Sequence, residues 1–398
     1  MKKLIVVLFA LFLVYSVQAQ KFVWDKLNSG ISTGTLYDIK FRNSSLGMAV
    51  GNDNSTNYVL KTTDGGNNWT NMATTDINQM VRACAFVDDT TIYVIGRKGG
   101  LFNTMDGGQS WTKINLGTNV DLIDISVPDR NSGYICTKGG RYIYYTGTAW
   151  ATKTVNTVDD FVAVGFPSKN DGFLTAHNGR VWRTTDGGTN WDTVKTDLEN
   201  TLGSYFFAYN VGYVVGSGGM AKRTINGGVT WSDTFIYPDG FSHIDFRAVY
   251  FPQANFGFIG GDSGLILRTS DGGSNWIREF TNLDEKIYKI SAPSLTIAYA
   301  AGENGIILKR RDASSLDEQS VDRFKLFPNP AHTTLFIEYP FNIQAQLTIY
   351  NVNGKEVFKT LPANRLIHSI DISRFAVGMY LVKLVSNQDI SWKKVLIR

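Results

Sequence analysis

The chain has 398 residues with 43% hydrophobic residues and a formal charge of +4, and this length suggests two or three domains. The near balance of 39 basic and 35 acidic residues argues against nucleic acid or an anionic membrane surface as a partner. Only two cysteines occur, Cys84 and Cys136, both in apolar, strand-like runs. We expect two buried, unlinked thiols, with a disulfide as the alternative in an oxidising compartment.

Residues 1–19 have the pattern of a secretory signal peptide. Lys2 and Lys3 precede an apolar run from Leu4 to Val14, and Val17-Gln18-Ala19 supplies the small-residue pattern of a cleavage site. We therefore expect cleavage before Gln20, with an uncleaved N-terminal anchor as the alternative. No later segment reaches the roughly eighteen consecutive apolar residues of a membrane-spanning helix, so the sequence predicts no transmembrane segment in the mature chain.

A turn motif recurs along the chain after the signal peptide, in which Asp-Gly-Gly is separated from a Trp by two residues. Full copies occupy Thr62–Trp69, Thr104–Trp111, Thr184–Trp191, Thr224–Trp231 and Thr269–Trp276, and a shortened copy occupies Tyr145–Trp150. The glycines permit the positive φ angles of a tight hairpin, and the Asp carboxylate can accept hydrogen bonds from the amides of its own turn. Trp then starts the next strand and buries aromatic surface. We assign structural roles to Asp64, Asp106, Asp186, Asn226 and Asp271, and to Trp69, Trp111, Trp191, Trp231 and Trp276.

The spacing of the tryptophans predicts the architecture. Intervals of 39 to 45 residues separate Trp24, Trp69, Trp111, Trp150, Trp191, Trp231 and Trp276. A strand-rich repeat of this period is typical of a four-stranded propeller blade. The last unit reaches Ile306–Arg310 without a Trp strand of its own, whereas Phe22–Leu27 is a Trp strand that precedes any complete unit. Pairing these two strands would close the ring and remove both sheet edges. The sequence thus predicts an all-β chain with a seven-bladed β-propeller over residues 20–311; six or eight blades are the alternatives.

The turn motif resembles the Asp-box (BNR) repeat of sialidases. The longer pattern of residues 261–273, Gly-Asp-Ser-Gly-Leu-Ile-Leu-Arg-Thr-Ser-Asp-Gly-Gly, is more similar to that of photosystem II stability/assembly factor-like propellers. The resemblance covers roughly residues 21 to 312 and is specific for the fold, not for a function.

The C-terminal part reads as a separate domain. Residues 312–323 are polar and acidic, typical of a linker, and short predicted strands separated by turn residues follow over 324–398, which predicts a small antiparallel β-sandwich. The segment resembles the type A C-terminal sorting domain of the type IX secretion system in Phe327–Ala331, Ile349–Lys355, Gly378–Tyr380 and Lys393–Arg398. The resemblance implies a Bacteroidetes-type bacterium, Sec export, and passage through the outer membrane by the type IX machinery. Removal of the domain would follow, with release or attachment to the cell surface, and photosystem assembly is not expected. An ordinary accessory β-domain is the alternative.

The sequence gives little support for catalysis. A sialidase needs an arginine cluster for the substrate carboxylate, a Tyr–Glu nucleophile pair and an Asp that acts as acid and base. The predicted propeller has only four glutamates, Glu199, Glu279, Glu285 and Glu303. The sequence contains no cluster of Cys and His residues of the kind that binds a metal. Residues 52–57 (Asn-Asp-Asn-Ser-Thr-Asn) are better explained as a solvated loop than as a Ca²⁺ site. We predict no catalytic residue, no metal and no cofactor; a glycan-active hydrolase or lyase of Asp-box type is the alternative.

The loops that join second to third strands, and those that join one blade to the next (Asp159-Asp160 and His243-Ile244-Asp245), should form the ligand-binding face. Candidate ligand-binding residues in these loops are Arg97, Lys98, Lys138, Arg141, His177, Arg180, Asp262 and Glu303. Because several are cationic and lie in consecutive units, we expect a basic patch that favours an anionic glycan or an acidic protein segment. Ordinary solvated surface is the alternative. The sequence thus predicts a secreted or surface-attached binding scaffold that recognises a protein or a polysaccharide.

Overall fold

The computed structural model describes residues 22–235, 244–312, 324–338, 345–360, 367–386 and 389–398. The predicted signal peptide and almost all of the predicted linker lie outside the described residues.

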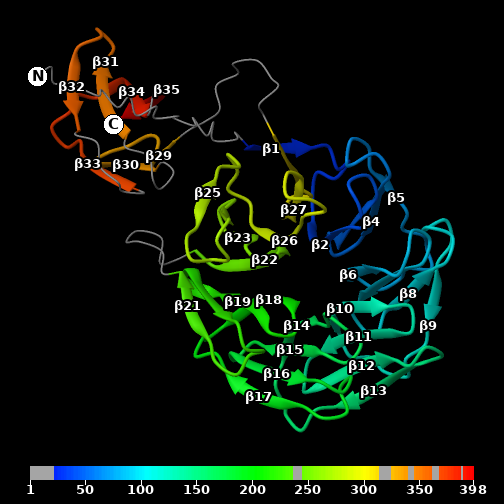
Figure 1. Ribbon diagram of the computed structural model, residues 1–398. Helices are drawn as coiled ribbons and strands as arrows, with labels where there is room; N and C mark the ends of the chain where they lie inside the picture. Colours follow the sequence, from blue (N-terminus) through cyan, green and yellow to red (C-terminus); the bar gives the residue numbers. More distant parts are fainter. Residues whose placement is uncertain (1–21, 236–243, 313–323, 339–344, 361–366, 387–388) are drawn as a thin grey trace, which may run out of the picture.

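Four-stranded antiparallel sheets account for most of the described chain, and Figure 1 shows those of residues 22–312 arranged in a ring. The first three sheets in chain order contain β2 (Thr35–Phe41), β3 (Gly47–Asn52), β4 (Asn57–Thr62) and β5 (Thr70–Asn71); β6 (Val81–Phe86), β7 (Ile92–Gly96), β8 (Leu101–Thr104) and β9 (Thr112–Ile114); and β10 (Leu122–Asp129), β11 (Ser132–Thr137), β12 (Arg141–Tyr145) and β13 (Trp150–Thr154). The next three contain β14 (Phe161–Gly165), β15 (Gly172–Ala176), β16 (Arg180–Thr184) and β17 (Asp192–Lys195); β18 (Thr201–Ala208), β19 (Val211–Gly216), β20 (Met220–Thr224) and β21 (Ser232–Phe235); and β22 (Phe246–Gln253), β23 (Phe256–Gly261), β24 (Ile266–Thr269) and β25 (Ile277–Glu279). A further sheet combines β26 (Ile287–Ser291), β27 (Ala298–Gly302) and β28 (Ile307–Asp312) with β1 (Phe22–Leu27).

The ring closes on itself through the first strand of each sheet. Each of β2, β6, β10, β14, β18 and β22 contacts the first strand of the following sheet, and β26 contacts β2. In the described chain the one helical element is the 3₁₀ turn η1 (Ser217–Gly219) between β19 and β20. The all-β prediction is therefore confirmed.

The Asp-Gly-Gly turn has the same hydrogen-bond pattern in each full copy. In the first copy, the Thr62 hydroxyl donates to Asp64 Oδ1 at 2.8 Å and accepts from the Gly66 amide at 2.8 Å, while Asp64 Oδ1 also accepts from the Asn68 amide at 2.9 Å. Gly65 and Gly66 have φ angles of 70° and 85°, which favour glycine. The turn residues thus satisfy one another's hydrogen bonds locally, and the pattern can repeat wherever Thr, Asp or Asn, and Gly recur at this spacing.

Each turn is also tied to the preceding sheet of the ring. In three turns a cation on the third strand of the preceding sheet donates to the first Gly carbonyl: Lys61 Nζ to Gly107 O at 2.7 Å, Arg183 NH1 to Gly227 O at 3.2 Å and Lys309 Nζ to Gly65 O at 2.8 Å. In the other two full turns a tyrosine hydroxyl of the preceding sheet donates to a Gly carbonyl. The Trp that follows the turn packs edge-on against an aromatic ring in four of the five full copies, as Trp231 does on Phe206 with centroids 6.2 Å apart. In the remaining copy the Trp111 indole donates to the Met72 carbonyl oxygen at 3.0 Å. The hydrogen bonds to the Gly carbonyls therefore connect neighbouring sheets, whereas the contact between Trp231 and Phe206 lies within one sheet.

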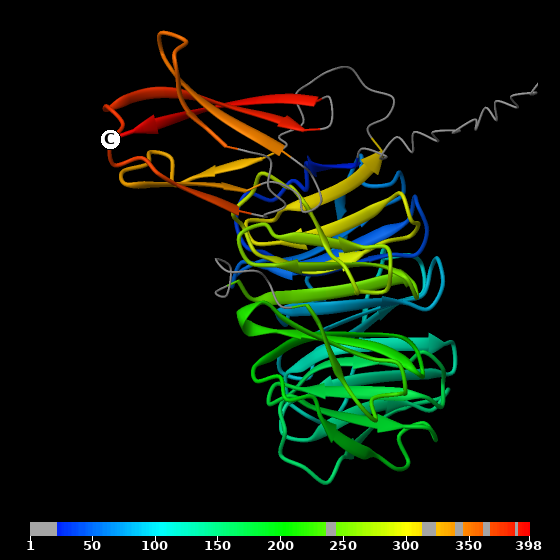
Figure 2. The same cartoon turned by 60° about the vertical axis from the view of Figure 1, so that its left-hand side comes forward.

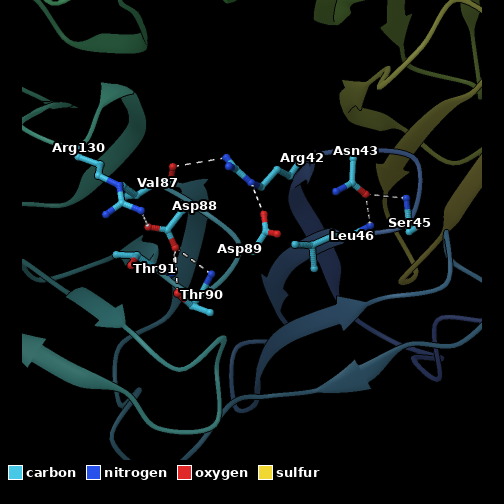
Figure 3. Close-up of polar contacts among 10 residues, drawn as sticks. All are labelled: Arg42, Asn43, Ser45, Leu46, Val87, Asp88, Asp89, Thr90, Thr91 and Arg130. Atoms are coloured by element: carbon cyan, nitrogen blue, oxygen red, sulfur yellow. Dashed lines mark hydrogen bonds and ion pairs between the residues drawn. The ribbon is translucent and has the colours of Figure 1, made fainter.

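The turns between the first two strands add ion pairs between sheets at the same end of the ring (Figure 3). Arg42 Nε lies 2.5 Å from Asp89 Oδ1, and Arg130 NH2 lies 2.8 Å from Asp88 Oδ2. Asp88 also accepts hydrogen bonds from the Thr91 and Thr90 amides, and these lower its pKa well below the ordinary range. A single turn thus binds cations from both neighbouring sheets. Each exposed ion pair of this kind contributes little to the free energy of unfolding.

The N-terminal strand completes the last sheet, as the sequence predicts. β1 pairs antiparallel with β28, with Trp24 opposite Arg310. The Arg310 side chain is fully buried and donates to both oxygens of Glu279 on β25, at 2.7 and 2.8 Å. The Trp24 indole donates to the same carboxylate at 2.8 Å, and Arg268 Nε does so at 2.8 Å. The Glu279 carboxylate of the neighbouring sheet thus links β1 and β28, the two strands whose pairing closes the ring.

The C-terminal residues form two antiparallel sheets beside the ring (Figure 2). One contains β29 (Lys325–Phe327), β30 (Thr334–Glu338) and β33 (Ile367–Asp371), and the other contains β32 (Glu356–Lys359), β31 (Ala345–Asn351), β34 (Gly378–Ser386) and β35 (Asp389–Ile397). Leu335 of the first sheet and Leu347 and Val382 of the second belong to one buried cluster. A buried ion pair between Arg278 of β25 and Glu338 of β30 joins this part to the outermost strand of a ring sheet.

The sequence predicts that the two cysteines are buried and unlinked. Cys84 and Cys136 are buried and unlinked, so the alternative of a disulfide is wrong for this structure. Burial raises the pKa of both thiols well above the ordinary value.

None of the described helical residues forms a segment long and apolar enough to cross a membrane.

Candidate ligand-binding site

The first strand of every ring sheet carries a β-bulge at the same position. In each of these strands the register with the second strand skips one residue near the strand's start. The skipped residues are Tyr37, Arg82, Ile123, Val162, Leu202, Arg247 and Tyr288. A bulge redirects a side chain away from the regular alternation. Together these residues form what we call the bulge ring, and all of them line one cavity of about 490 Å³.

An ion pair crosses the ring within the lining of this cavity. Lys289 Nζ of β26 lies 3.6 Å from Asp124 Oδ1 of β10, although these strands belong to sheets that are not neighbours. Asp124 Oδ2 also accepts from the Val164 amide at 3.2 Å, which fixes the carboxylate. On the neighbouring side, Asp38 accepts from the Cys84 amide at 3.0 Å and lies 3.9 Å from Lys40 Nζ. The two carboxylates Asp38 and Asp124 are therefore each compensated by a lysine.

Three of the predicted binding residues reach the cavity. Arg97, Lys138 and His177 line it, together with Asp121 and Asp160 from the adjoining loops. Arg97 is exposed, and its guanidinium has no hydrogen bond or ion pair with any residue that the structure describes. Lys138 Nζ lies 4.0 Å from Asp160, and His177 Nδ1 lies 3.0 Å from the Thr201 carbonyl oxygen. The loop prediction thus identified part of the cavity rim.

The other predicted binding residues lie outside the cavity lining. Arg180 pairs with Asp159 at 3.3 Å, and Glu303 pairs with Lys286 at 3.2 Å. Lys98 and Arg141 are exposed, and the Lys98 amide donates to Asp121 at 3.0 Å. Arg247 NH2 donates to Asp262 Oδ2 at 3.1 Å. Asp262 therefore orients one side chain of the bulge ring without lining the cavity itself.

Carboxylates make the loop face less basic than its lysines and arginines alone predict. Burial by itself would raise the pKa of Asp159, but hydrogen bonds from Trp182 and Asn178 lower it below the ordinary value, so this group stays anionic beside Arg180. The hydrogen bond from Arg247 to Asp262 raises the pKa of that guanidinium. The sequence placed Asp159 and Asp262 in loops of this face, but it could not show which arginine each carboxylate pairs with, because that depends on how folding places the loops.

A Tyr–Glu contact lies at the same rim. The Tyr288 hydroxyl is 3.4 Å from Glu303 Oε1, and the Arg247 guanidinium lies 5.5 Å from the centre of the Tyr288 ring. Burial, followed by the charge of Glu303, raises the pKa of Tyr288, so the phenol is neutral and weakly nucleophilic. No group of three or more His, Cys, Asp or Glu side chains among the described residues could hold a metal ion.

The comparison that decides the family is the match to the model described as photosynthesis system II assembly factor YCF48, over residues 16–149, 144–239 and 201–323. This chain belongs to the YCF48 family. In this YCF48-family chain, residues 325–398 match the secretion system C-terminal sorting domain. Such a domain implies interaction with the type IX secretion machinery and export to the cell surface or the medium. No curated protein matches the chain.

Solved structures support the propeller fold of this YCF48-family chain. A structure titled "YCF48 bound to D1 peptide" has 18% identity and a TM-score of 0.60, and the match covers 73% of this chain and 94% of that one. PorZ, an essential bacterial surface component of the type-IX secretion system of Porphyromonas gingivalis, has 12% identity and a TM-score of 0.55 over 92% of this chain and 59% of PorZ. Streptogramin B lyase has 13% identity and a TM-score of 0.61 over 73% and 98%. Because one of these neighbours is named a lyase, the shared fold does not decide between binding and catalysis.

Proposed function

We propose that this chain is an exported, non-catalytic binding protein whose propeller recognises an acidic protein segment at the rim of its central cavity. The ring sheets would be the blades of a seven-bladed propeller over residues 20–311, and residues 324–398 a small β-sandwich that serves type IX export. Of the predicted basic patch (Arg97, Lys98, Lys138, Arg141 and Arg180), Arg97 and Lys138 line the cavity and would contact the bound segment.

The observation that carries this proposal is an uncompensated cation at the cavity rim. Arg97 lines the cavity and has no acidic partner among the described residues, unlike Arg180, which Asp159 neutralises. An arginine in this state can offer its fork of donors to a carboxylate from another molecule. The related YCF48 structure has a peptide as its ligand, which favours a protein segment over a polysaccharide here.

Thermal unfolding of the purified protein tests the proposal, because a ligand that binds only the folded state raises the Tm by mass action. Poly-L-glutamate should raise the Tm, and the double variant Arg97→Gln/Lys138→Gln should lose most of that shift. Arg374→Gln, an exposed arginine of the C-terminal part, is the matched control and should keep it. A shift with polygalacturonate but not with poly-L-glutamate would overturn the protein segment in favour of an anionic glycan.

The alternative of a glycan-active enzyme has one observation in its favour, the contact between Tyr288 and Glu303 beside Arg247. Against it, Asp262 already neutralises that arginine, and Lys286 holds Glu303. Release of sugar from sialosides or anionic polysaccharides, abolished in Tyr288→Phe, would establish this alternative in place of a binding role. Binding without turnover would support the proposed function.

A further inference from the structure

The bulge ring has two chemically different walls. Ile123, Val162 and Leu202 come from three consecutive sheets and form an aliphatic wall. Arg247, Tyr288, Tyr37 and Arg82 come from the remaining four sheets and form a cationic–aromatic wall. The backbone irregularity is the same in every sheet, so the contrast between the walls arises only from the side chains.

The four residues of the cationic–aromatic wall form a continuous row. The rings of Tyr288 and Tyr37 meet edge to face with centroids 5.7 Å apart. Each ring carries a guanidinium on its outer side: Arg247 lies 5.5 Å from the Tyr288 ring and Arg82 lies 5.7 Å from the Tyr37 ring. Cation–π contacts and ring contacts of this kind restrict the orientation of all four side chains.

The two arginines of the row differ in their available charge. Arg247 binds Asp262 through two nitrogens and lies 3.5 Å from Asp245, so its charge is compensated. Arg82 is exposed at the cavity and forms no hydrogen bond or ion pair with the part of the chain that the structure describes. The cationic–aromatic wall therefore presents one unpaired guanidinium, supported by a tyrosine ring, to whatever enters.

The three side chains of the aliphatic wall form no hydrogen bonds themselves, although the loop residues Lys138 and His177 line the same cavity. Val162 and Leu202 are half-buried and Ile123 is 8% exposed, so their remaining surface faces the cavity that they line. Hydroxyl groups of a sugar ring that faced these three side chains would lose hydration without gaining a hydrogen bond from them, which is unfavourable. An apolar side chain would gain from the same contact.

We propose that the cavity binds one apolar side chain of the recognised segment against the aliphatic wall, while a neighbouring acidic side chain pairs with Arg82. This inference rests on the proposed binding of an acidic protein segment and specifies its sequence: an aliphatic residue adjacent to Asp or Glu. The volume of about 490 Å³ is in the range of small-ligand sites and accommodates such a pair of side chains.

Short labelled peptides test this specificity on the whole protein without its predicted signal peptide. The probe is acetyl-Gly-Asp-Leu-Asp-Gly-amide, which presents Leu with Asp on both sides, so the direction of binding need not be known. The comparison peptides replace Leu with Gly or both Asp residues with Asn. We expect at least tenfold weaker binding for each comparison peptide, measured by fluorescence anisotropy.

Variants then separate the two walls. Arg82→Gln should abolish the preference for Asp over Asn but retain the preference for Leu over Gly. Val162→Thr, which conserves size, should do the reverse, and Leu202→Asn provides a second substitution in the same wall. Arg374→Gln should keep both preferences.

The outcomes also separate this inference from the proposed function. Equal binding of the Leu and Gly peptides would overturn the cavity specificity, although the acidic-segment function would stand. Failure of all three peptides in a protein whose Tm rises with poly-L-glutamate would likewise overturn only the cavity specificity. No response to either probe would overturn both.

Discussion

The two ends of the ring sheets differ in whether the same side chains recur from sheet to sheet. At the end with the Asp-Gly-Gly turns, the same residue types recur and make the same contacts, as Thr62 and Thr269 do with their own turns. At the opposite end, where second strands turn into third strands, a backbone bulge recurs in the first strand of every sheet, but its side chain is Tyr, Arg or an aliphatic residue. The comparison teaches that repeated side chains in this chain maintain the ring, whereas varied side chains on a repeated backbone are available for recognition.

The largest expected effect concerns ring closure. Glu279→Ala leaves the fully buried Arg310 without a carboxylate, and removing one partner of a buried ion pair typically costs about 3–5 kcal/mol. Urea unfolding should show this loss, while Glu199→Ala, the same change at an exposed residue, should alter the free energy of unfolding by less than about 0.5 kcal/mol. Similar values for the two variants would show that closure does not depend on the Glu279 network.

A smaller effect is expected within one repeated turn. Thr184→Val keeps the shape of a buried side chain but removes the hydroxyl that accepts from the Gly188 amide at 2.9 Å. A buried amide left without a partner costs about 1–3 kcal/mol. Thr185→Val, at the neighbouring exposed residue, is the matched control for the same unfolding measurement. If both variants were equally stable, the repeated hydroxyl would not be structural.

The turn carboxylates also predict how stability depends on pH. Hydrogen bonds from Asn68 lower the pKa of Asp64 to about 2, and those from Asn190 lower the pKa of Asp186 to about 2. Because these values lie below the ordinary 3.8, the unfolded chain binds protons first as the pH falls. The stabilisation is complete above about pH 4 and is lost progressively towards about pH 2.

Thermal unfolding between pH 6 and pH 2 would measure this loss, with Asp64→Asn/Asp186→Asn as the test variant. Asn226 already makes the equivalent contacts in another turn, with its Oδ1 accepting from the Thr230 amide at 3.0 Å, so the substitution should preserve the fold. The variant should show a shallower decline in Tm below pH 4. An unchanged slope would assign the acid sensitivity to other groups.

The smallest expected effect on stability lies at the cavity. Arg82→Gln removes a side chain without an ion pair in the described structure, so the free energy of unfolding should change by less than about 0.5 kcal/mol. Urea unfolding of Arg82→Gln and of Glu279→Ala under the same conditions compares the stability cost of a substitution at the cavity with that of a substitution at the ring closure. A cost above about 1 kcal/mol would mean that the cationic–aromatic row is structural and that the two ends of the sheets do not differ as argued.

The sequence by itself determined the all-β class, the period of the sheets, the pairing of the first and last strands and the match of the C-terminal part to a sorting domain. These features could be predicted because each depends on residues close together in the chain or on a fixed spacing: the Thr62, Asp64 and Gly66 contacts span only four residues.

Only the tertiary structure decided which residues form the candidate site. Tyr37, Arg82, Arg247 and Tyr288 are distant in sequence, and a bulge near the start of each strand turns their side chains towards one cavity. Strand periodicity does not reveal a bulge, since one extra residue shifts the alternation without changing composition. The carboxylate partners of Arg180 and Arg247 were equally hidden, because a side chain's effective charge depends on neighbours that folding brings from other loops.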